Sequence, residues 1–279
     1  AYTYPWVRPI PDFYGVTPVF HFDGADFAHK WDLWDGGLRL KVFAGRSTAY
    51  FPTGDEEIKL TLNPLIGATL VYERDLWRFR LSNTSVELDS NNVNVELKNS
   101  LEAASVFWPG ATNILSELSL EKAKVDYSAI GATFDNNTWL LQTEWAHIKG
   151  NLSSTPRSQN WYISLAYRWQ EFTPFVIIAG AEPDHPEQQV SLPPLPPQLA
   201  QALEPLRLGS EIALNATRQD QRGYGLGMRW DFMPKRALKI QWDHWDIAAN
   251  GRLLWVTPMT GGYQDESVNV ISISFDILF

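Results

Sequence analysis

The C-terminal stretch Asn269-Val270-Ile271-Ser272-Ile273-Ser274-Phe275-Asp276-Ile277-Leu278-Phe279 decides the fold class. Every odd position from Ile271 to Phe279 carries a large apolar side chain, whereas the even positions include Ser272, Ser274 and Asp276. Successive side chains of a β-strand point to opposite faces, so this period of two predicts a strand with one apolar face and one polar face. A helix would need apolar residues spaced by three and four.

The same alternation recurs along the chain, for example in residues 161–169 and 224–232. Links that are short and turn-like alternate strictly with long ones, which lie near 47–63, 87–120, 150–159, 182–221 and 247–267. This alternation of link lengths is typical of an up-and-down membrane barrel, with short periplasmic turns and long extracellular loops. It predicts eleven strands, at about 24–34, 38–46, 65–73, 76–86, 122–134, 138–149, 160–170, 174–181, 222–232, 237–246 and 268–279.

The positions of tryptophan favour a membrane barrel over a soluble barrel of the lipocalin type. Among the 13 tryptophans, five lie beside short links: Trp34, Trp77, Trp139, Trp169 and Trp230. Strand propensity explains the number of aromatic residues but not this placement, which suits a membrane–water interface. We therefore predict one all-β domain over residues 1–279, a transmembrane antiparallel up-and-down β-barrel.

The composition excludes several other classes of protein. The chain has 279 residues, a net charge of −9 and no cysteine, which argues against a nucleic-acid partner, a disulfide framework and a thiolate metal site. It has no run of eighteen apolar residues, so no transmembrane helix is expected. The mean hydropathy of −0.23 still suits barrel strands, in which apolar residues alternate with polar ones. No cofactor or metal is expected.

Two motifs carry a family resemblance. The terminal strand ending in Phe279 resembles the C-terminal assembly strand of Gram-negative outer-membrane proteins. The stretch Tyr4-Pro5-Trp6-Val7-Arg8-Pro9, with Tyr14-Gly15 and Asp23-Gly24-Ala25-Asp26 after it, is similar to a segment of proteobacterial porins. The resemblance implies a passive channel for small hydrophilic solutes or ions in the bacterial outer membrane, in contact with lipid and lipopolysaccharide and often a homotrimer. The permeant solute is not identified by it.

The predicted strand number raises a question of closure. In such porins the Tyr-Pro-Trp segment lies well inside the chain, and a closed bacterial barrel normally has an even number of strands. We therefore expect about five further N-terminal strands, giving sixteen. In the alternative, residues 13–22 supply one more strand and the total is twelve, although Pro18 and the prolines before it weigh against this.

The polar residues that alternate with the apolar ones along each strand are expected to face the lumen. Arg39, Lys41, Arg78 and Arg80 come from two upward strands and predict a local basic wall that favours anions. Alternatively, these charges pair across strands and only solvate the lumen. The phase is ambiguous in 122–134 and 174–181, which are apolar on both faces. The other charged residues of the lumenal phase are Asp26, Lys30, Glu144, Arg168, Arg229, Asp231, Lys239 and Asp243.

Three further segments have a predicted structure. Residues 1–22 combine Tyr4, Trp6 and Arg8 with several prolines, and they either fold inward as a constriction or form an external loop. A proline-rich stretch leads to an expected short helix at 198–203 with Pro197 at its start. Another loop helix is expected within 97–107.

The alternative function is an outer-membrane barrel enzyme, phospholipase-like or protease-like, that uses histidines at the rim. His147 near Glu144 and His244 between Asp243 and Asp246 are its candidates. No nucleophile motif such as G-x-S-x-G is present, so no catalytic residue is assigned and we predict that the protein is not an enzyme. His29 shares the apolar phase of its strand, which suits an interface with another subunit.

Overall fold

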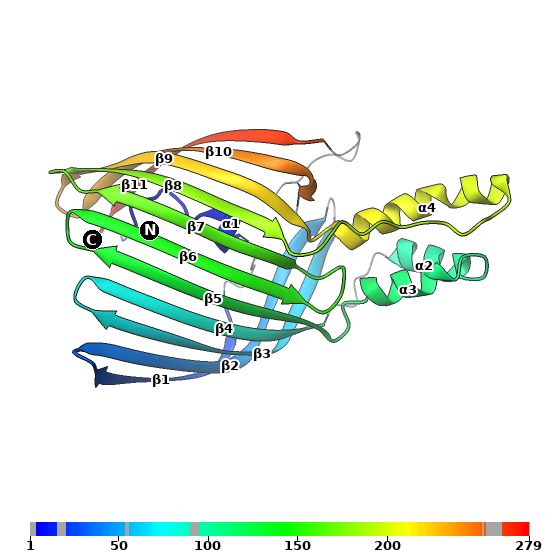
Figure 1. Ribbon diagram of the computed structural model, residues 1–279, viewed down its shortest axis with the longest axis horizontal. Coiled ribbons are helices and arrows are strands. Elements are labelled where there is room, and N and C mark those ends of the chain that lie inside the picture. Colours follow the sequence, from blue (N-terminus) through cyan, green and yellow to red (C-terminus); the bar gives the residue numbers. More distant parts are fainter. Residues whose placement is uncertain are drawn as a thin grey trace.

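The computed structural model describes residues 4–15, 21–53, 56–89, 95–252, 254 and 264–278. Within them, eleven antiparallel strands form one sheet whose spatial order follows the chain from β1 to β11. Figure 1 shows the strands side by side and inclined to the long axis. The architecture and the number of strands confirm the prediction. The strands are β1 (Asp23–Leu33), β2 (Gly36–Thr53), β3 (Glu56–Arg74), β4 (Trp77–Asp89), β5 (Ala123–Asp135), β6 (Trp139–Gly150), β7 (Arg157–Tyr167), β8 (Phe172–Pro183), β9 (Gln219–Met233), β10 (Arg236–Arg252) and β11 (Glu266–Ile277).

The short links are tight turns in which the backbone takes a left-handed conformation. Trp34 and Asp35 between β1 and β2 have φ angles of 51° and 58°, and Asn137 between β5 and β6 has 65°. Two consecutive residues with positive φ match the twist of a two-residue hairpin, and Asp and Asn tolerate this conformation better than most residues. These turns place neighbouring strands in direct register, for example Trp31 opposite Leu38.

The two faces of the sheet differ as the alternation predicts. In β7, Ile163 is 49 % exposed, whereas Tyr162 and Ser164 on either side are only 1 % and 2 % exposed. The outward face carries an exposed apolar row that continues through Leu226 and Ile273. Such a face is stable against lipid and costly against water. The row also contains Phe79, Leu81, Ile130, Val176, Ile178, Ile240, Trp242, Ile271, Phe275 and Ile277.

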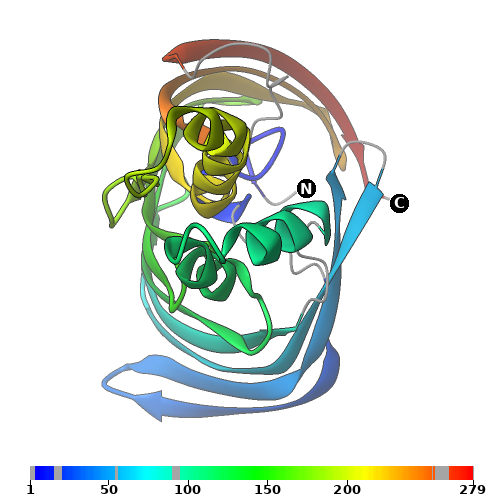
Figure 2. The same ribbon diagram turned by 90° about the vertical axis from the view of Figure 1, so that its right-hand side faces the viewer.

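The sheet is curved, and its concave face holds a segment from the start of the chain (Figure 2). Residues 4–15, which we call the inner segment, contain the short helix α1 (Pro11–Tyr14). Of the two alternatives for this segment, inward folding is therefore the observed one. The described residues 13–15 and 21–22 form no strand, and the rest of the segment that the twelve-strand alternative invokes lies outside the described residues. Within the described residues, β1 and β11 are not paired with each other.

Two predicted long loops are wrong over much of their length because the flanking strands continue. β2 and β3 stay paired from Ser47↔Leu62 to Thr53↔Glu56, beyond an irregularity in register, so 47–63 is mostly strand. β10 likewise extends to Arg252 and β11 begins at Glu266, which shortens the predicted loop 247–267. The extensions of β2 and β10 lack a regular alternation of apolar and polar residues, so the period of two did not reveal them.

Two other long links contain helices that project beyond one end of the sheet (Figure 1). They are α2 (Val95–Ala104), α3 (Gly110–Leu118) and α4 (Pro197–Asn215). Leu101, Trp108, Ile114 and Leu214 share an apolar core among them. α4 begins at Pro197 as predicted but extends well past 203, and α2 starts and ends a little before the predicted 97–107. No helix in the described part of the chain is long and apolar enough to cross a membrane.

Candidate functional site

Aromatic residues fix the inner segment to the concave face of the sheet. The Trp6 indole is buried, donates a hydrogen bond from Nε1 to Ser164 Oγ (2.9 Å) and meets the Tyr162 ring edge-on at 5.7 Å. α1 brings Phe13 to within 5.3 Å of the same ring. The start of α1 is favoured by Pro11, whose fixed φ suits a first helical turn. Burial of these rings provides most of the hydrophobic free energy of docking.

Contact with the inner segment explains the strands whose phase was ambiguous. In β8, Phe175, Ile177 and Ala179 point inward and join the same buried cluster as Trp6 and Phe13. In β5, Ala129 belongs to this cluster while Ile130 is exposed on the outward face. Both faces of these strands are apolar because exposed outward residues alternate with residues that pack against the inner segment.

Charged residues anchor the segment as well. Arg8 Nη2 lies 2.5 Å from Asp243 Oδ2, and its guanidinium lies 5.3 Å from the centre of the Trp245 ring. Lys239 is buried, with its ammonium 2.8 Å from Asp276 Oδ2 and 3.2 Å from the Trp6 carbonyl oxygen. A buried cation needs such partners, since leaving it unpaired costs several kcal/mol. Lys239 therefore lies beneath the inner segment.

Asp12 is the acidic residue of the inner segment, and it is buried. Its carboxylate accepts hydrogen bonds from Gln221 Nε2 (2.6 Å) and Trp245 Nε1 (3.0 Å), and its backbone carbonyl accepts one from Asn160 Nδ2 (2.7 Å). Burial raises the pKa of Asp12, and the hydrogen bonds oppose the rise without cancelling it. Gly223 leaves room for this arrangement, because a Cβ there would lie only 2.8 Å from both Asp12 Oδ2 and Trp245 Nε1.

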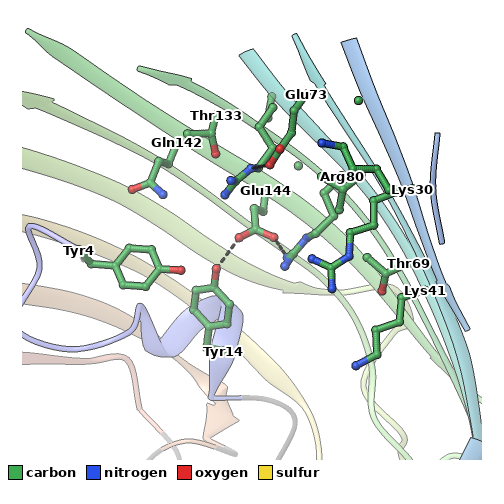
Figure 3. A pocket seen from close by; sticks show the side chains of 16 residues that line it. Tyr4, Tyr14, Lys30, Lys41, Thr69, Glu73, Arg80, Thr133, Gln142 and Glu144 are labelled. Carbon is green, nitrogen blue, oxygen red and sulfur yellow. Dashed lines mark hydrogen bonds and ion pairs between the residues drawn. The ribbon is translucent and has the colours of Figure 1, made fainter. Parts of the chain in front are cut away.

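A cavity of about 570 Å³ lies between the inner segment and strands β1–β6 (Figure 3). Tyr4 and Tyr14 line one side of it. Among the described residues, five cationic side chains and two carboxylates line it. The five cations, which we call the open wall, are Lys30, Arg39, Lys41, Arg78 and Arg80.

The cations of the open wall differ in their partners. Lys41 lies 3.1 Å from Asp26, Arg78 lies 2.5 Å from Glu73, and Arg80 contacts Glu144. Lys30 and Arg39 form no ion pair with any residue that the structure describes. Three cations are thus partly neutralised, and two leave a positive field in the cavity.

Glu144 connects the open wall to the inner segment. Its carboxylate accepts hydrogen bonds from the hydroxyls of Tyr14 and Tyr162, the latter at 2.8 Å, and also pairs with Arg80. Figure 3 shows Tyr14 and Arg80 reaching this carboxylate from opposite sides. Burial and the nearby Glu144 charge raise the pKa of Tyr14, so its hydroxyl stays protonated and keeps donating. Glu144 therefore holds the inner segment at a fixed distance from the basic side chains.

Arg168, Arg229 and Asp231 do not line this cavity, whereas Asp26 borders it through its pair with Lys41. Arg168 forms a two-pronged pair with Asp135 at 2.6 and 2.9 Å, and Arg229 forms one with Asp231 at 2.8 and 2.6 Å. Trp6 and Arg8 lie against the sheet, whereas Tyr4 lines the cavity. Of the three suggested constriction residues, only Tyr4 lines this cavity.

Sequence reasoning missed Glu73, Asp12 and Tyr14. Glu73 shares a strand face with Thr69 and Val71, so the alternation of β3 contained enough information to find it. Asp12 and Tyr14 belong to a proline-rich segment without periodicity, and no pattern indicates which strands they contact.

The two histidine candidates for catalysis have carboxylate and amide partners. His147 Nε2 lies 3.0 Å from Asp184, and His244 lies 3.1 Å from Asp246 and 3.0 Å from Asn269. Within the described part of the chain, neither imidazole hydrogen-bonds a hydroxyl that might act as a nucleophile. The described residues also contain no cluster of His, Asp and Glu that could hold a metal ion.

In sequence, the chain matches no family model and no curated protein. In structure, it is similar to the anion-selective porin from Comamonas acidovorans, with a TM-score of 0.53 and 9 % identity over 96 % of this chain and 66 % of that one. The chain has a porin-like fold. It spans about two thirds of the length of that porin.

Two other solved structures are less similar to this porin-like chain. The NanC porin has a TM-score of 0.39 and 8 % identity, over 92 % of this chain and 100 % of its own. OccK10 from Pseudomonas aeruginosa has a TM-score of 0.31 and 11 % identity, over 92 % of this chain and 88 % of its own.

Proposed function

We propose that the protein is an outer-membrane porin that passes small hydrophilic solutes by diffusion and favours anions. The cavity beside the open wall carries this proposal, because cations outnumber carboxylates there by five to two among the described residues. The porin-like fold and the apolar outward face support a place in the outer membrane. The similar porin from Comamonas acidovorans is itself anion-selective, which agrees with this choice.

The proposed path runs between the inner segment and the open wall. A fixed positive charge beside a narrow aqueous path concentrates anions, and the low dielectric of the surrounding wall strengthens its field. Lys30 and Arg39 are expected to contribute most, since Lys41, Arg78 and Arg80 already face carboxylates. The net charge of −9 is compatible with this, because acids such as Glu96, Glu117, Glu204 and Glu211 lie in the long links outside the strands.

The inner segment is the proposed constriction. It lies on the concave face over β7–β10, so the proposed path runs on the side of the open wall. Its anchors lie on widely separated strands, for example Ser164 on β7 and Asp243 on β10. A constriction held at several points keeps its position while solute passes.

The assembled barrel needs its sheet edges paired, because unpaired backbone groups are costly in lipid. We propose that further strands join the edges of β1 and β11 in the membrane, and sixteen strands remain our prediction for the closed barrel. A homotrimer is proposed from His29, which lies among the outward residues of β1 beside Phe27 and Trp31. A polar ring in this row suits a protein contact better than lipid. Chemical cross-linking in membranes tests the oligomer.

The reversal potential of single channels in a salt gradient tests the proposed selectivity. Lys30→Gln with Arg39→Gln should shift the reversal potential strongly toward cation preference, most at low salt where screening is weak. The matched control is Arg78→Gln with Glu73→Gln, which removes an ion pair and leaves the net charge unchanged. The control should shift the potential little. Absence of stepwise currents in the unchanged protein, or equal shifts in both variants, would overturn the proposal.

The enzyme alternative is tested with the two histidines. His147→Ala and His244→Ala should leave the currents intact, because both side chains lie away from the open wall. Hydrolysis of lipid or peptide that is lost in either variant would favour an enzyme instead.

A further inference from the structure

Tyr4 gives the cavity an aromatic surface on the side of the inner segment. Its ring stacks on Trp6 with the ring centres 5.0 Å apart and an interplanar angle of 9°. The Trp6 ring is itself buried and hydrogen-bonded to Ser164, so it forms a fixed support for one face of Tyr4. Tyr4 nevertheless remains 45 % exposed and lines the cavity. It is therefore an aromatic platform that is held in place and still accessible.

The same cavity places positive charge across from this platform. Figure 3 shows Tyr4 on one side and Lys30, Lys41 and Arg80 on the other, with Glu144 and Tyr14 between them. Lys30 and Arg39 have no carboxylate partner in the described part of the chain, so their charge is available to a solute. Gln142 and Thr133 add polar groups beside the platform. The volume of about 570 Å³ lies in the range of small-molecule sites.

We propose that this cavity is a binding site for small aromatic carboxylates, whose ring stacks on Tyr4 while the carboxylate faces Arg39 and Lys30. This inference rests on the proposed function and specifies its solute class. A carboxylate alone would be attracted by the cations, and a neutral ring alone would stack on Tyr4. Only a molecule that carries both groups uses both sides of the cavity, and it gains a contact that inorganic anions lack.

Block of the chloride current by benzoate, acetate and benzyl alcohol tests this site. Benzoate carries both the ring and the carboxylate, acetate carries the carboxylate alone, and benzyl alcohol carries the ring without a carboxylate. Benzoate should block at a concentration about two- to tenfold lower than acetate, the range that one aromatic stacking contact provides. Benzyl alcohol should block least. Equal block by benzoate and acetate, or block by benzyl alcohol as strong as by benzoate, would overturn the proposal.

Two substitutions of Tyr4 distinguish the contribution of its ring from that of its hydroxyl. Tyr4→Leu should remove the preference for benzoate over acetate, whereas Tyr4→Phe should keep it. A benzoate preference that survives in Tyr4→Leu would overturn the site, even where the anion selectivity of the channel stands.

A second measurement does not depend on conductance. Saturation-transfer NMR of benzoate with the detergent-solubilised protein should show contact of its ring protons with the unchanged protein and with Tyr4→Phe. The contact should fall several-fold in Tyr4→Leu. An equal contact in all three proteins would contradict the site, whatever the currents show.

Discussion

Two regions of the concave face follow the same alternation and have opposite chemistry. The open wall on β1–β4 presents Lys30, Arg39, Lys41, Arg78 and Arg80 to a cavity. The covered wall, which we define as the inward residues of β7–β10 beneath the inner segment, presents apolar rings and buried polar side chains such as Phe175 and Gln221. The difference shows that inward residues are selected by what they contact, which is water in one region and the inner segment in the other.

The covered wall also shows how polar residues are used when water is absent. Gln221, Asn160 and Lys239 are buried there, and each has a partner in the inner segment. Buried polar groups cost free energy unless they are hydrogen-bonded. These residues consequently favour one docked position of the segment, whereas purely apolar contacts would tolerate several.

The largest effect is expected at the covered wall, from Trp6→Ala. The change removes a buried aromatic side chain and its hydrogen bond, which should weaken docking of the inner segment by about 3–5 kcal/mol. Chymotrypsin should then cut after Phe13, which is protected in the unchanged protein. Trp31→Ala, on the outward face of β1, is the control and should leave this protection intact. Unchanged protection in Trp6→Ala would remove the distinction between the two walls.

The next largest effect is expected from an arginine introduced on the outward face, compared with the same side chain introduced at the open wall. Ile163→Arg places a charge in the lipid-facing row of β7 and should lower the free energy of unfolding from vesicles by about 2–4 kcal/mol. Gln142→Arg adds the same side chain beside the cavity, where water solvates it, and should change stability much less. Guanidinium titration of both variants measures the difference. Equal losses would show that the two faces are assigned wrongly.

A smaller effect is expected from the titration of Asp12 at the covered wall. Its pKa is raised by burial, so the docked segment binds the proton more tightly than the undocked segment does. Docking should therefore be strongest at acidic pH and weaken as the pH rises from the ordinary value of Asp through the raised pKa. Asp243, which pairs with Arg8, adds to the rise in this pKa.

A nitroxide spin label attached to Pro9→Cys, at an exposed position of the inner segment, reports this docking through its mobility. Mobility should rise with pH across that window, and Asp12→Asn should flatten the profile because the titrating group is gone. A profile that stays pH-dependent in Asp12→Asn would assign the effect to another group.

The smallest effect is expected at the open wall, in the pair of Lys41 and Asp26. Both side chains are about one third or more exposed, so their mutual stabilisation should be below about 1 kcal/mol and should fall with added salt. A double-mutant cycle with Lys41→Gln and Asp26→Asn measures it. A larger coupling would mean that the open wall is less hydrated than we infer.

The period of two was sufficient to predict the number of strands and the faces of most of them. Ile163 and Ser164 are a clear case, because one residue separates the lipid-facing row from the buried face. The cations of the open wall were predictable for the same reason, since residues two apart on a strand share a face. Strand ends were less predictable, because at 47–63 the pairing continues where the apolar alternation stops.

The covered wall was not predictable from local pattern. Its partners lie far apart in the sequence, as Asp12 with Gln221 and Trp6 with Ser164 show. Residues 174–181 are apolar on both faces because of these contacts, but this pattern does not indicate which segment of the chain covers them. Ion pairing across strands was equally hidden, so the distinction between Arg39 and the paired Arg78 came only from the structure.

The reactivity of single cysteines tests the contrast between the two walls most directly, and the chain contains no native cysteine to remove. Thr69→Cys lies at the cavity and Ala179→Cys beneath the inner segment. In the membrane-inserted protein, a charged water-soluble thiol reagent should modify the first variant rapidly and the second at least tenfold more slowly. Adding Trp6→Ala should speed only the second. Equal rates in the two single-cysteine variants would contradict a covered wall and an open wall on one sheet.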